Sequence, residues 1–322
     1  AWFEQGQPYV DGVRHAIIPD AAQRLAQFTA GNIDIVGGLY IDDLETMKRN
    51  NPRAQVIGRW DQGGPIVYFQ LGDPASPFQD IRLRRAVSLA IDRNSFAKAL
   101  LRDQWQQSFN VPLNMGKWAL KLSDLPAETA QWYTYNLERA KRLVEEAGAA
   151  GMTLKLLYPR PHPRDPYLKT AAETVANMLS ALPWKLSLVF IDYNKDWVGG
   201  GKGVRYGNFP SDSLVLTGIE GRTDVDECLY GWWHSKSTSS ISRVQDTAFD
   251  AMIERARTLL NEDERVKASI EIQRYMADKV YSGAGNPSGF VYTMVQARVR
   301  NYTTGDEYGI GTSTWGKLWL KK

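Results

Sequence analysis

The chain has 322 residues, of which 43% are hydrophobic, enough for about two domains with buried cores. Its 39 lysines and arginines are nearly balanced by 36 aspartates and glutamates, so the formal net charge is only +3. A dedicated nucleic-acid binder would carry a basic stripe and a larger positive excess, so we expect no nucleic-acid partner. The single cysteine, Cys228, excludes an internal disulfide framework and a zinc site with several thiolates.

Neither a membrane span nor a signal peptide is predicted within the chain. It contains no apolar run of about 18 residues, and its first residues lack the pattern of a secretory signal. If the protein is exported, we expect its targeting segment to lie outside this chain.

The first part of the chain predicts a helix that leads into a short strand. Asp20 is a helix N-cap residue, apolar residues follow it at helical spacing, and Gly31 ends the helix. The apolar run 33–36 then predicts a strand, so the pair is typical of an α/β unit. Two further apolar runs, 54–60 and 65–71, also predict strands.

The segment SPFQDIRLRRAVSLAIDR, residues 76–93, places several arginines on one predicted helix. Arg82 and Arg85 lie off its apolar stripe, so we interpret the arginines as a solvated face or as local partners of acidic neighbours. Asp92 is predicted to cap a second helix, because the helix dipole disfavours an anion at the C-terminus of the first. The apolar stripe consists of Leu83, Ala86, Val87, Ala90 and Ile91.

From Asn136 onward, predicted helices and strands alternate with short connections. Asn136 caps a helix that Gly148 ends, and the order helix, strand, helix, strand predicts an α/β domain. The chain then predicts two long amphipathic helices and a strand, and it ends in a turn and a short strand over 308–322. The predicted ranges are 152–158, 184–192 and 289–299 for strands and 167–182, 247–260 and 262–280 for helices.

Two stretches resemble ligand loops only superficially. In GGGKGV, residues 199–204, the lysine is followed by glycine where a phosphate loop needs Ser or Thr, so we predict a flexible loop. In the acidic stretch 220–227, EGRTDVDE, Leu229 and Ser235 stand where a calcium loop requires Gly and Glu, which argues against calcium.

The remaining reactive residue types favour structural roles. His15, His162 and His234 are far apart in the sequence, and none has a second histidine at metal spacing, so we predict structural or surface roles and no metal site. Cys228 opens an apolar helix, where a buried inert thiol is expected. No nucleophile elbow and no distinctive carboxylate pair is present. We therefore predict no catalytic residues, no cofactor and no enzymatic activity.

Five collinear segments of the chain resemble one family, the family 5 extracellular solute-binding proteins, which are receptors of dipeptide, oligopeptide and nickel ABC transporters. The most specific is PFQDIRLRRAVSLAIDR, which is similar to the family signature of an arginine-rich helix followed by Ala-Ile-Asp-Arg. The others stand in the expected order, and the resemblance covers nearly the whole chain. The five segments are 6–36, 77–93, 135–148, 152–159 and 290–299.

The resemblance implies the two-lobe α/β fold of the type II periplasmic-binding-protein class. Members of this family are longer, so we expect a C-terminal portion with a truncated first lobe and a complete second lobe. Residues 1–71 and 290–322 would form the first-lobe remnant, and residues 72–289 the second lobe. The strands IVYFQL and GFVYTM would cross between the lobes as hinges, and an apolar surface around IDIVGGL would be exposed on the remnant.

The resemblance also implies positions that face the ligand. In oligopeptide-binding members a carboxylate pairs with the α-amine of the peptide; that position is Gly221 here, and Glu220 is the adjacent carboxylate that could substitute. Arg205 could pair with a ligand carboxylate, and tyrosines could stack on apolar or sugar faces, although core or rim roles for these residues stay open. The implied pocket positions are Tyr193, Arg205, Gly218, Ile219 and Tyr292.

The function implied by the resemblance is that of the substrate-binding component of an ABC importer. Its lobes would close on a small polar solute, peptide-like or related, and deliver it to the permease subunits in the membrane. We expect a monomer in the periplasm or outside the cell, with any membrane anchor in an N-terminal segment absent from this chain.

Three alternatives to this function stay open. The first is an oligosaccharide- or opine-binding receptor of the same fold. The second is a sugar-processing enzyme, which would need two carboxylates about 5 to 9.5 Å apart across a cleft. The third is a structural or sensory module that uses the fold without transport.

Overall fold

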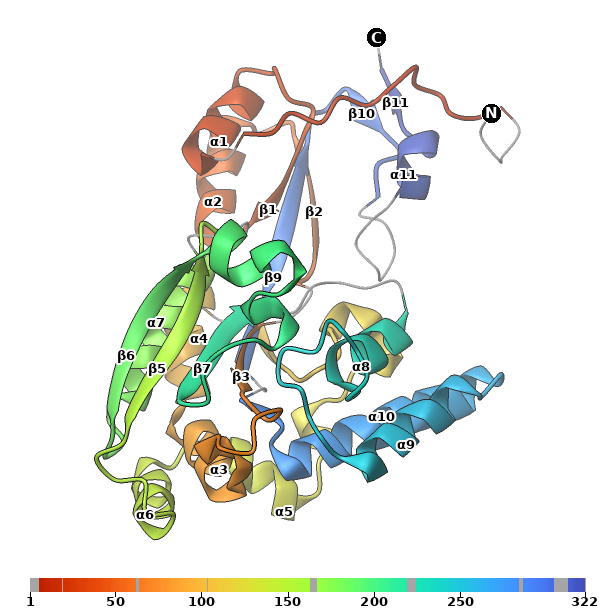
Figure 1. The fold of residues 1–322 in the computed structure, drawn as a ribbon. Coiled ribbons are helices and arrows are strands. Elements are labelled where there is room, and N and C mark those ends of the chain that lie inside the picture. Colours follow the sequence, from red (N-terminus) through yellow and green to blue (C-terminus); the bar gives the residue numbers. More distant parts are fainter. Residues whose placement is uncertain are drawn as a thin grey trace. The chain divides into compact units, whose positions relative to one another are not determined.

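The chain folds into two compact units in the computed structural model (Figure 1). One unit comprises Ala1–Asp61 and Gly289–Lys322, and the other comprises Gln62–Ser288. No helix within the described ranges is long and apolar enough to cross a membrane. The structure describes residues 6–18, 20–61, 64–102, 104–162, 167–218, 224–283, 286–303 and 312–321.

The first unit contains a small antiparallel sheet with two helices. Strand β9 (Asn286–Val295) lies between β1 (Ile35–Leu39) and β2 (Gln55–Trp60) and is antiparallel to both. Helices α1 (Ala21–Thr29) and α2 (Ile41–Asn50) pack against β1. Asp20 caps α1, as predicted, by accepting a hydrogen bond from the N–H of Gln23. The buried core of this unit consists of Phe28, Val36, Leu39, Leu44, Met47 and Met294.

The C-terminal segment of the first unit differs from its prediction. We expected a turn and a short strand over 308–322, but the described part of this segment also holds a short helix, α11 (Thr312–Lys317), before β11 (Trp319–Leu320). Strand β11 pairs with β10 (Val299–Arg300). Residues 33–37 line an open groove together with residues 10 and 12–18. Ile17, one of these lining residues, is 92% exposed.

The second unit is built on a mixed five-stranded sheet. Strand β5 is parallel to both β6 and β7. The strands β5 and β6 belong to the region where the sequence predicted alternating helices and strands. Strand β3 is antiparallel to β7 and β8. It therefore belongs to the second unit, which begins at Gln62, before the position 72 expected from the sequence. The strand order is β6 (Lys185–Asp192), β5 (Thr153–Arg160), β7 (Ser213–Gly218), β3 (Pro65–Phe69) and β8 (Ser282–Gly283).

Helices cover this sheet and extend from it (Figure 1). The predicted N-caps Asp92 and Asn136 are confirmed, because each accepts a backbone N–H bond at the start of a helix. Asp80 caps α3 in the same way, although the sequence analysis did not predict this cap. The remaining elements are α3 (Ile81–Ala90), α4 (Arg93–Leu101), β4 (Trp105–Ser108), α5 (Ala127–Ala130), α6 (Leu137–Glu146), α7 (Tyr167–Leu179), α8 (Val225–Trp233), α9 (Thr247–Arg257) and α10 (Glu262–Lys279). Short helical turns are η1 (Pro77–Gln79), η2 (Leu113–Trp118), η3 (Leu122–Asp124), η4 (Gln131–Tyr133), η5 (Tyr193–Val198), η6 (Gly199–Gly201) and η7 (Val204–Tyr206).

The arginines of residues 76–93 do not all lie on a solvated face, and this prediction was wrong for two of them. The side chain of Arg82 is 44% exposed and pairs with Asp80, as expected. Arg84 is buried and donates to the carbonyl oxygens of Phe78 and Lys279 at 2.6 and 3.0 Å. Arg93 is also buried and donates to Ser88. Both side chains donate hydrogen bonds to backbone carbonyl oxygens, several of which are buried.

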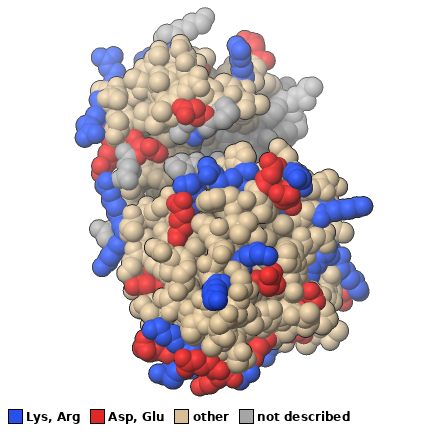
Figure 2. All heavy atoms as spheres, turned by 60° about the vertical axis from the view of Figure 1, so that its left-hand side comes forward, with Lys and Arg blue, Asp and Glu red and all other residues tan. Residues whose placement is uncertain are grey.

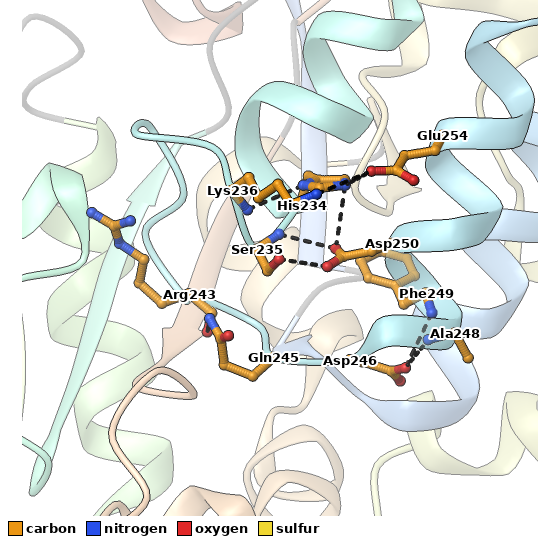
Figure 3. Close-up of polar contacts among 10 residues, drawn as sticks. All are labelled: His234, Ser235, Lys236, Arg243, Gln245, Asp246, Ala248, Phe249, Asp250 and Glu254. Atoms are coloured by element: carbon orange, nitrogen blue, oxygen red, sulfur yellow. Dashed lines mark hydrogen bonds and ion pairs between the residues drawn. The ribbon is translucent and has the colours of Figure 1, made fainter.

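Other structural predictions are confirmed. Cys228 is buried and lies 3.6 Å from the sulfur of Met115. His234 is fully buried: its Nδ1 accepts the N–H of Lys236 at 3.1 Å, and its Nε2 lies 3.2 Å from the carboxylate of Glu254 (Figure 3). In the space-filling view, charges of both signs are interspersed on the face shown, in keeping with the balanced composition (Figure 2).

The pair Asp80–Arg82 predicts an acid-sensitive contribution to stability. The hydrogen bond from the Arg82 side chain holds the pKa of Asp80 below its ordinary value of 3.8. A carboxyl with a lowered pKa stabilises the fold above its unfolded pKa, and this contribution is lost as the pH falls through the folded value. We expect Asp80→Ala to lower the free energy of unfolding by about 1 kcal/mol at pH 7 through loss of the cap.

Urea unfolding at pH 7 and below pH 3.8 measures this effect. The difference between Asp80→Ala and the wild type should shrink at the lower pH. Replacement of the exposed Glu145 by Ala is the control, with a change of about 0.5 kcal/mol or less at pH 7. An Asp80→Ala deficit that stayed constant down to the lowest pH would contradict the assignment.

Candidate ligand-binding site

A hollow in the second unit is lined in part by the neighbouring strands β3 and β7. Its cavity volume is about 30 Å³, and the larger space of about 450 Å³ between the lining atoms includes open solvent. Tyr68 comes from β3, and Thr217 and Gly218 come from the end of β7. The register pairs Tyr68 with Val215 and Ile66 with Thr217. Because opposed residues of antiparallel strands share a face, Tyr68 and Thr217 point to the same side of the sheet.

Two tryptophans form an apolar wall of the hollow. Trp197 comes from η5 and Trp232 from α8, and both side chains are largely buried. Beneath the hollow, the ring of Tyr68 stacks on Trp233, with ring centroids 5.6 Å apart. Such rigid indole and phenol rings offer flat apolar surfaces on which a ligand can pack.

His162 lines the same hollow from the loop that follows β5. Its Nε2 lies 3.5 Å from the hydroxyl oxygen of Thr217. Its ring stacks on Tyr158 and meets Tyr193 edge-on, with centroids 6.0 Å apart in both cases. The histidine for which the sequence predicted a structural or surface role therefore stands on the wall of a hollow, next to Tyr193.

The polar part of the hollow contains Arg205, which is half-buried on the short turn η7. Ser239 and Ile241, from the segment after α8, line it as well. None of the described lining residues is an aspartate or glutamate, whereas Arg205 and His162 can carry positive charge. This charge pattern suits an anionic group of a ligand, such as a carboxylate.

The structure places the predicted site residues in three different situations. Arg205 and Gly218 line the hollow, and Tyr193 contacts its lining residue His162. Tyr292 lies in the first unit, on β9, where it pairs with Leu39 and Gly58. Ile219, Glu220 and Gly221 lie outside the described residues.

Several lining residues were missed by the sequence analysis, and only some of them carried a usable signal. The apolar run 213–218, SLVLTG, could have predicted the strand that carries Thr217, but the sequence analysis predicted no strand there. Tyr68 lies on the predicted strand 65–71, and only the pairing of the two strands shows that the two residues share a face. Trp197, Trp232 and His162 carried no usable signal, because they come from turns and from a helix whose packing direction depends on the tertiary structure.

The alternative of a sugar-processing enzyme finds no support at this hollow. It requires two carboxylates across a cleft, and the described lining residues include none. Within the part of the chain that the structure describes, no group of three or more His, Cys, Asp or Glu side chains is arranged to hold a metal ion. Residues 199–203 form tight turns rather than the start of a helix, so a phosphate loop is not formed there.

Comparison with known proteins gives one family throughout. The family model of the bacterial extracellular solute-binding proteins, family 5, matches residues 2–240. The heme-binding protein A of Haemophilus influenzae is 24% identical over 274 residues, which is 82% of this chain and 46% of that protein. The dipeptide-binding protein of Escherichia coli is 23% identical over 278 residues, which is 85% of this chain and 49% of that protein.

Solved structures share the fold. The protein AgaA of Agrobacterium tumefaciens R10, bound to agropinic acid, has a TM-score of 0.76 at 17% identity, with 99% of this chain and 62% of AgaA covered. The protein DppA of Helicobacter pylori, bound to the peptide STSA, has a TM-score of 0.72 at 17% identity, with 95% of this chain and 56% of DppA covered. The fold is thus the type II periplasmic-binding-protein fold, as the sequence predicted.

The extent of these matches also bears on what the chain contains. It spans about half the length of the curated relatives cited above. The family match covers most of the chain, including the arginine-rich segment on which the resemblance was first drawn. The chain therefore belongs to the family 5 bacterial extracellular solute-binding proteins, which are binding proteins and not enzymes.

Proposed function

We propose that the protein is the substrate-binding component of an ABC importer, which binds a small solute between two lobes and delivers it to a membrane permease. The first unit would belong to one lobe and the second unit to the other, with the chain crossing near residues 61–62 and 288–289. The family membership supports a solute-binding role outside the cytoplasmic membrane. We retain a monomer as the expected state.

The observation that carries the ligand assignment is the hollow with Arg205 at its polar side and Trp197 and Trp232 at its apolar side. A carboxylate on the guanidinium and an apolar or planar group on the indoles would use both surfaces. Peptides offer a carboxylate and side chains, and the relatives named above include peptide-binding proteins and one bound to agropinic acid. We therefore propose a small organic acid, peptide-like or opine-like, as the ligand.

Native mass spectrometry of the full-length protein, purified without denaturation, would reveal a retained ligand as added mass. Thermal unfolding with Met-Leu, the peptide STSA, agropinic acid and haem then tests the ligand classes, because a ligand that binds the native state raises the melting temperature. We expect one acidic compound to raise it. Failure of all four, together with a mass that matches the polypeptide alone, would contradict the proposal.

The role of Arg205 is tested by replacement with glutamine. Loss of charge-assisted hydrogen bonds worth about 1.5–3 kcal/mol should weaken binding of the acidic compound by about 10- to 100-fold. Arg142, which is exposed on α6, provides the charge-matched control, and Arg142→Gln should leave the affinity unchanged. Equal affinities of Arg205→Gln and wild type would remove Arg205 from the site.

A further inference from the structure

The segment that carries Arg205 has little regular structure of its own. Residues 203–209 lie between η6 and β7 and contain only the single turn η7. Two backbone bonds stabilise that turn, from the N–H of Tyr206 to Gly203 and from the N–H of Gly207 to Val204, both at 3.0 Å. One turn is too short to persist alone, so side chains from elsewhere must hold it in place.

Gln70, which follows β3, is the first such side chain. It is only 4% exposed. Its Nε2 donates to the carbonyl oxygens of Gly207 and Phe209 at 3.0 and 2.9 Å, and its Oε1 accepts the N–H of Gly72 at 3.1 Å. Both N–H groups of the side-chain amide thus donate to the segment that bears Arg205. The bond that Oε1 accepts from Gly72 fixes the orientation of the amide.

Arg243 is the second side chain. Its Nε and Nη2 donate to the carbonyl oxygen of Tyr206, the residue directly after Arg205, at 3.0 and 2.6 Å. The aliphatic part of the Arg243 side chain occupies space beside Gly72 and Gly207. A Cβ added at Gly72 would lie 2.5 Å from it and a Cβ added at Gly207 would lie 2.4 Å from it, so neither position has room for a side chain. Because these two residues are glycines, there is room for the Arg243 side chain to reach residues 203–209.

The segment that carries Arg243 is itself fixed on α9 (Figure 3). On one side, Ser235 donates its N–H and its hydroxyl to the carboxylate of Asp250 at 3.0 and 2.5 Å. On the other side, Asp246 caps α9 by accepting the N–H groups of Ala248 and Phe249 at 2.9 and 3.1 Å. In the same view the Arg243 guanidinium points away from these contacts with α9. It is directed at the carbonyl oxygen of Tyr206, to which it donates.

We propose that Gln70 and Arg243 are positioning residues that hold the backbone directly after Arg205 and so set the direction of its guanidinium in the hollow. This proposal rests on the proposed function for its consequence in binding, but the positioning itself needs no ligand. Gln70 acts from the end of β3 and Arg243 from a segment anchored on α9, so two independent supports meet at residues 206–209.

Hydrogen–deuterium exchange of the variant Gln70→Glu tests the positioning without a ligand. Glutamate has the same shape but lacks the two N–H donors, and its carboxylate would face two carbonyl oxygens. We expect the amides of Tyr206 and Gly207 to exchange about tenfold faster than in the wild type, which corresponds to the loss of about 1.4 kcal/mol of local protection.

Gln273 provides a matched control. It is also buried, donates to the carbonyl oxygen of Trp118 at 2.7 Å and accepts the N–H of Leu120 at 3.0 Å. Gln273→Glu should speed exchange around residues 118–120 and leave Tyr206 and Gly207 unchanged. Unchanged exchange at these two amides in Gln70→Glu, or equal acceleration there in Gln273→Glu, would overturn the proposal.

Arg243→Lys guards against a failure of the first variant to fold. Lysine keeps the charge and most of the stem but loses the planar fork, so exchange at Tyr206 and Gly207 should again rise about tenfold. An unchanged rate in a folded Arg243→Lys protein would remove Arg243 from the proposal.

Binding is measured in the same variants with Met-Leu and agropinic acid. If either compound binds the wild type, Gln70→Glu should weaken it about tenfold and Gln273→Glu should not. An affinity that stays unchanged while exchange accelerates would overturn the link to Arg205. If neither compound binds the wild type, the ligand assignment loses its support, and the exchange rates still decide the positioning.

Discussion

Replacement of Arg84 by methionine is expected to lower the free energy of unfolding by about 3 kcal/mol. The buried guanidinium donates to the carbonyl oxygens of Phe78 and Gln79 before α3 and to those of Lys279 and Val280 at the end of α10. Methionine fills similar space without donors, so these acceptors would lose their partners away from water. Burial lowers the pKa of Arg84 to about 10, so the group stays charged at neutral pH.

Arg82 provides the control on the same helix. Its side chain is 44% exposed, pairs with Asp80 and donates to the exposed carbonyl oxygen of Glu146, so Arg82→Met should cost much less than Arg84→Met. Urea unfolding of both variants at pH 7 measures the difference. Losses of equal size would show that the carbonyl contacts of Arg84 contribute little.

Replacement of Trp233 by alanine is expected to lower the free energy of unfolding by about 3–5 kcal/mol. The indole is fully buried and stacks on Tyr68 beneath the hollow. Among the described residues its Nε1 has no hydrogen-bond partner, so Trp233→Phe removes apolar volume without breaking a hydrogen bond. We expect the phenylalanine variant to lose about 1.5 kcal/mol or less.

Trp184 provides the contrasting case. Its Nε1 donates to the carbonyl oxygen of Leu179 at 2.8 Å, so Trp184→Phe leaves that oxygen unpaired. We expect this variant to lose about 1–3 kcal/mol more than volume alone predicts. If Trp233→Phe proved as costly as Trp233→Ala, the indole would contribute through something other than its packing volume.

The helices of the second unit could be predicted from the sequence because the features that indicate a helix lie within a few residues of it. Asp92 and Asn136 were each predicted as N-caps from position alone, and each accepts a backbone N–H in the structure. A cap satisfies orphan donors within three residues, so no distant contact is needed to recognise it. The family resemblance came from the same local patterns.

Which arginines are buried could not be predicted from the sequence, because their burial depends on contacts with distant segments. Arg82, Arg84 and Arg93 look alike in the sequence, yet only Arg82 faces solvent. Arg84 is buried because the end of α10, about 195 residues later in the chain, presents carbonyl oxygens to it. Burial of a charged side chain depends on which acceptors the fold brings to it, and helical spacing holds no information about them.

Some residues of the candidate site could likewise be named from the sequence, and others could be found only in the tertiary structure. The sequence, with its family resemblance, named Arg205, Gly218 and Tyr193, and these three lie at or beside one hollow. The tryptophan wall, His162 and the supports from Gln70 and Arg243 come from segments that are remote in sequence and meet only when the sheet and α8 are assembled. By itself the sequence determined the elements, their caps and the family, because these depend on contacts a few residues apart. The tertiary structure alone decided which charges are buried and which side chains converge, because those outcomes depend on distant segments that supply the partners.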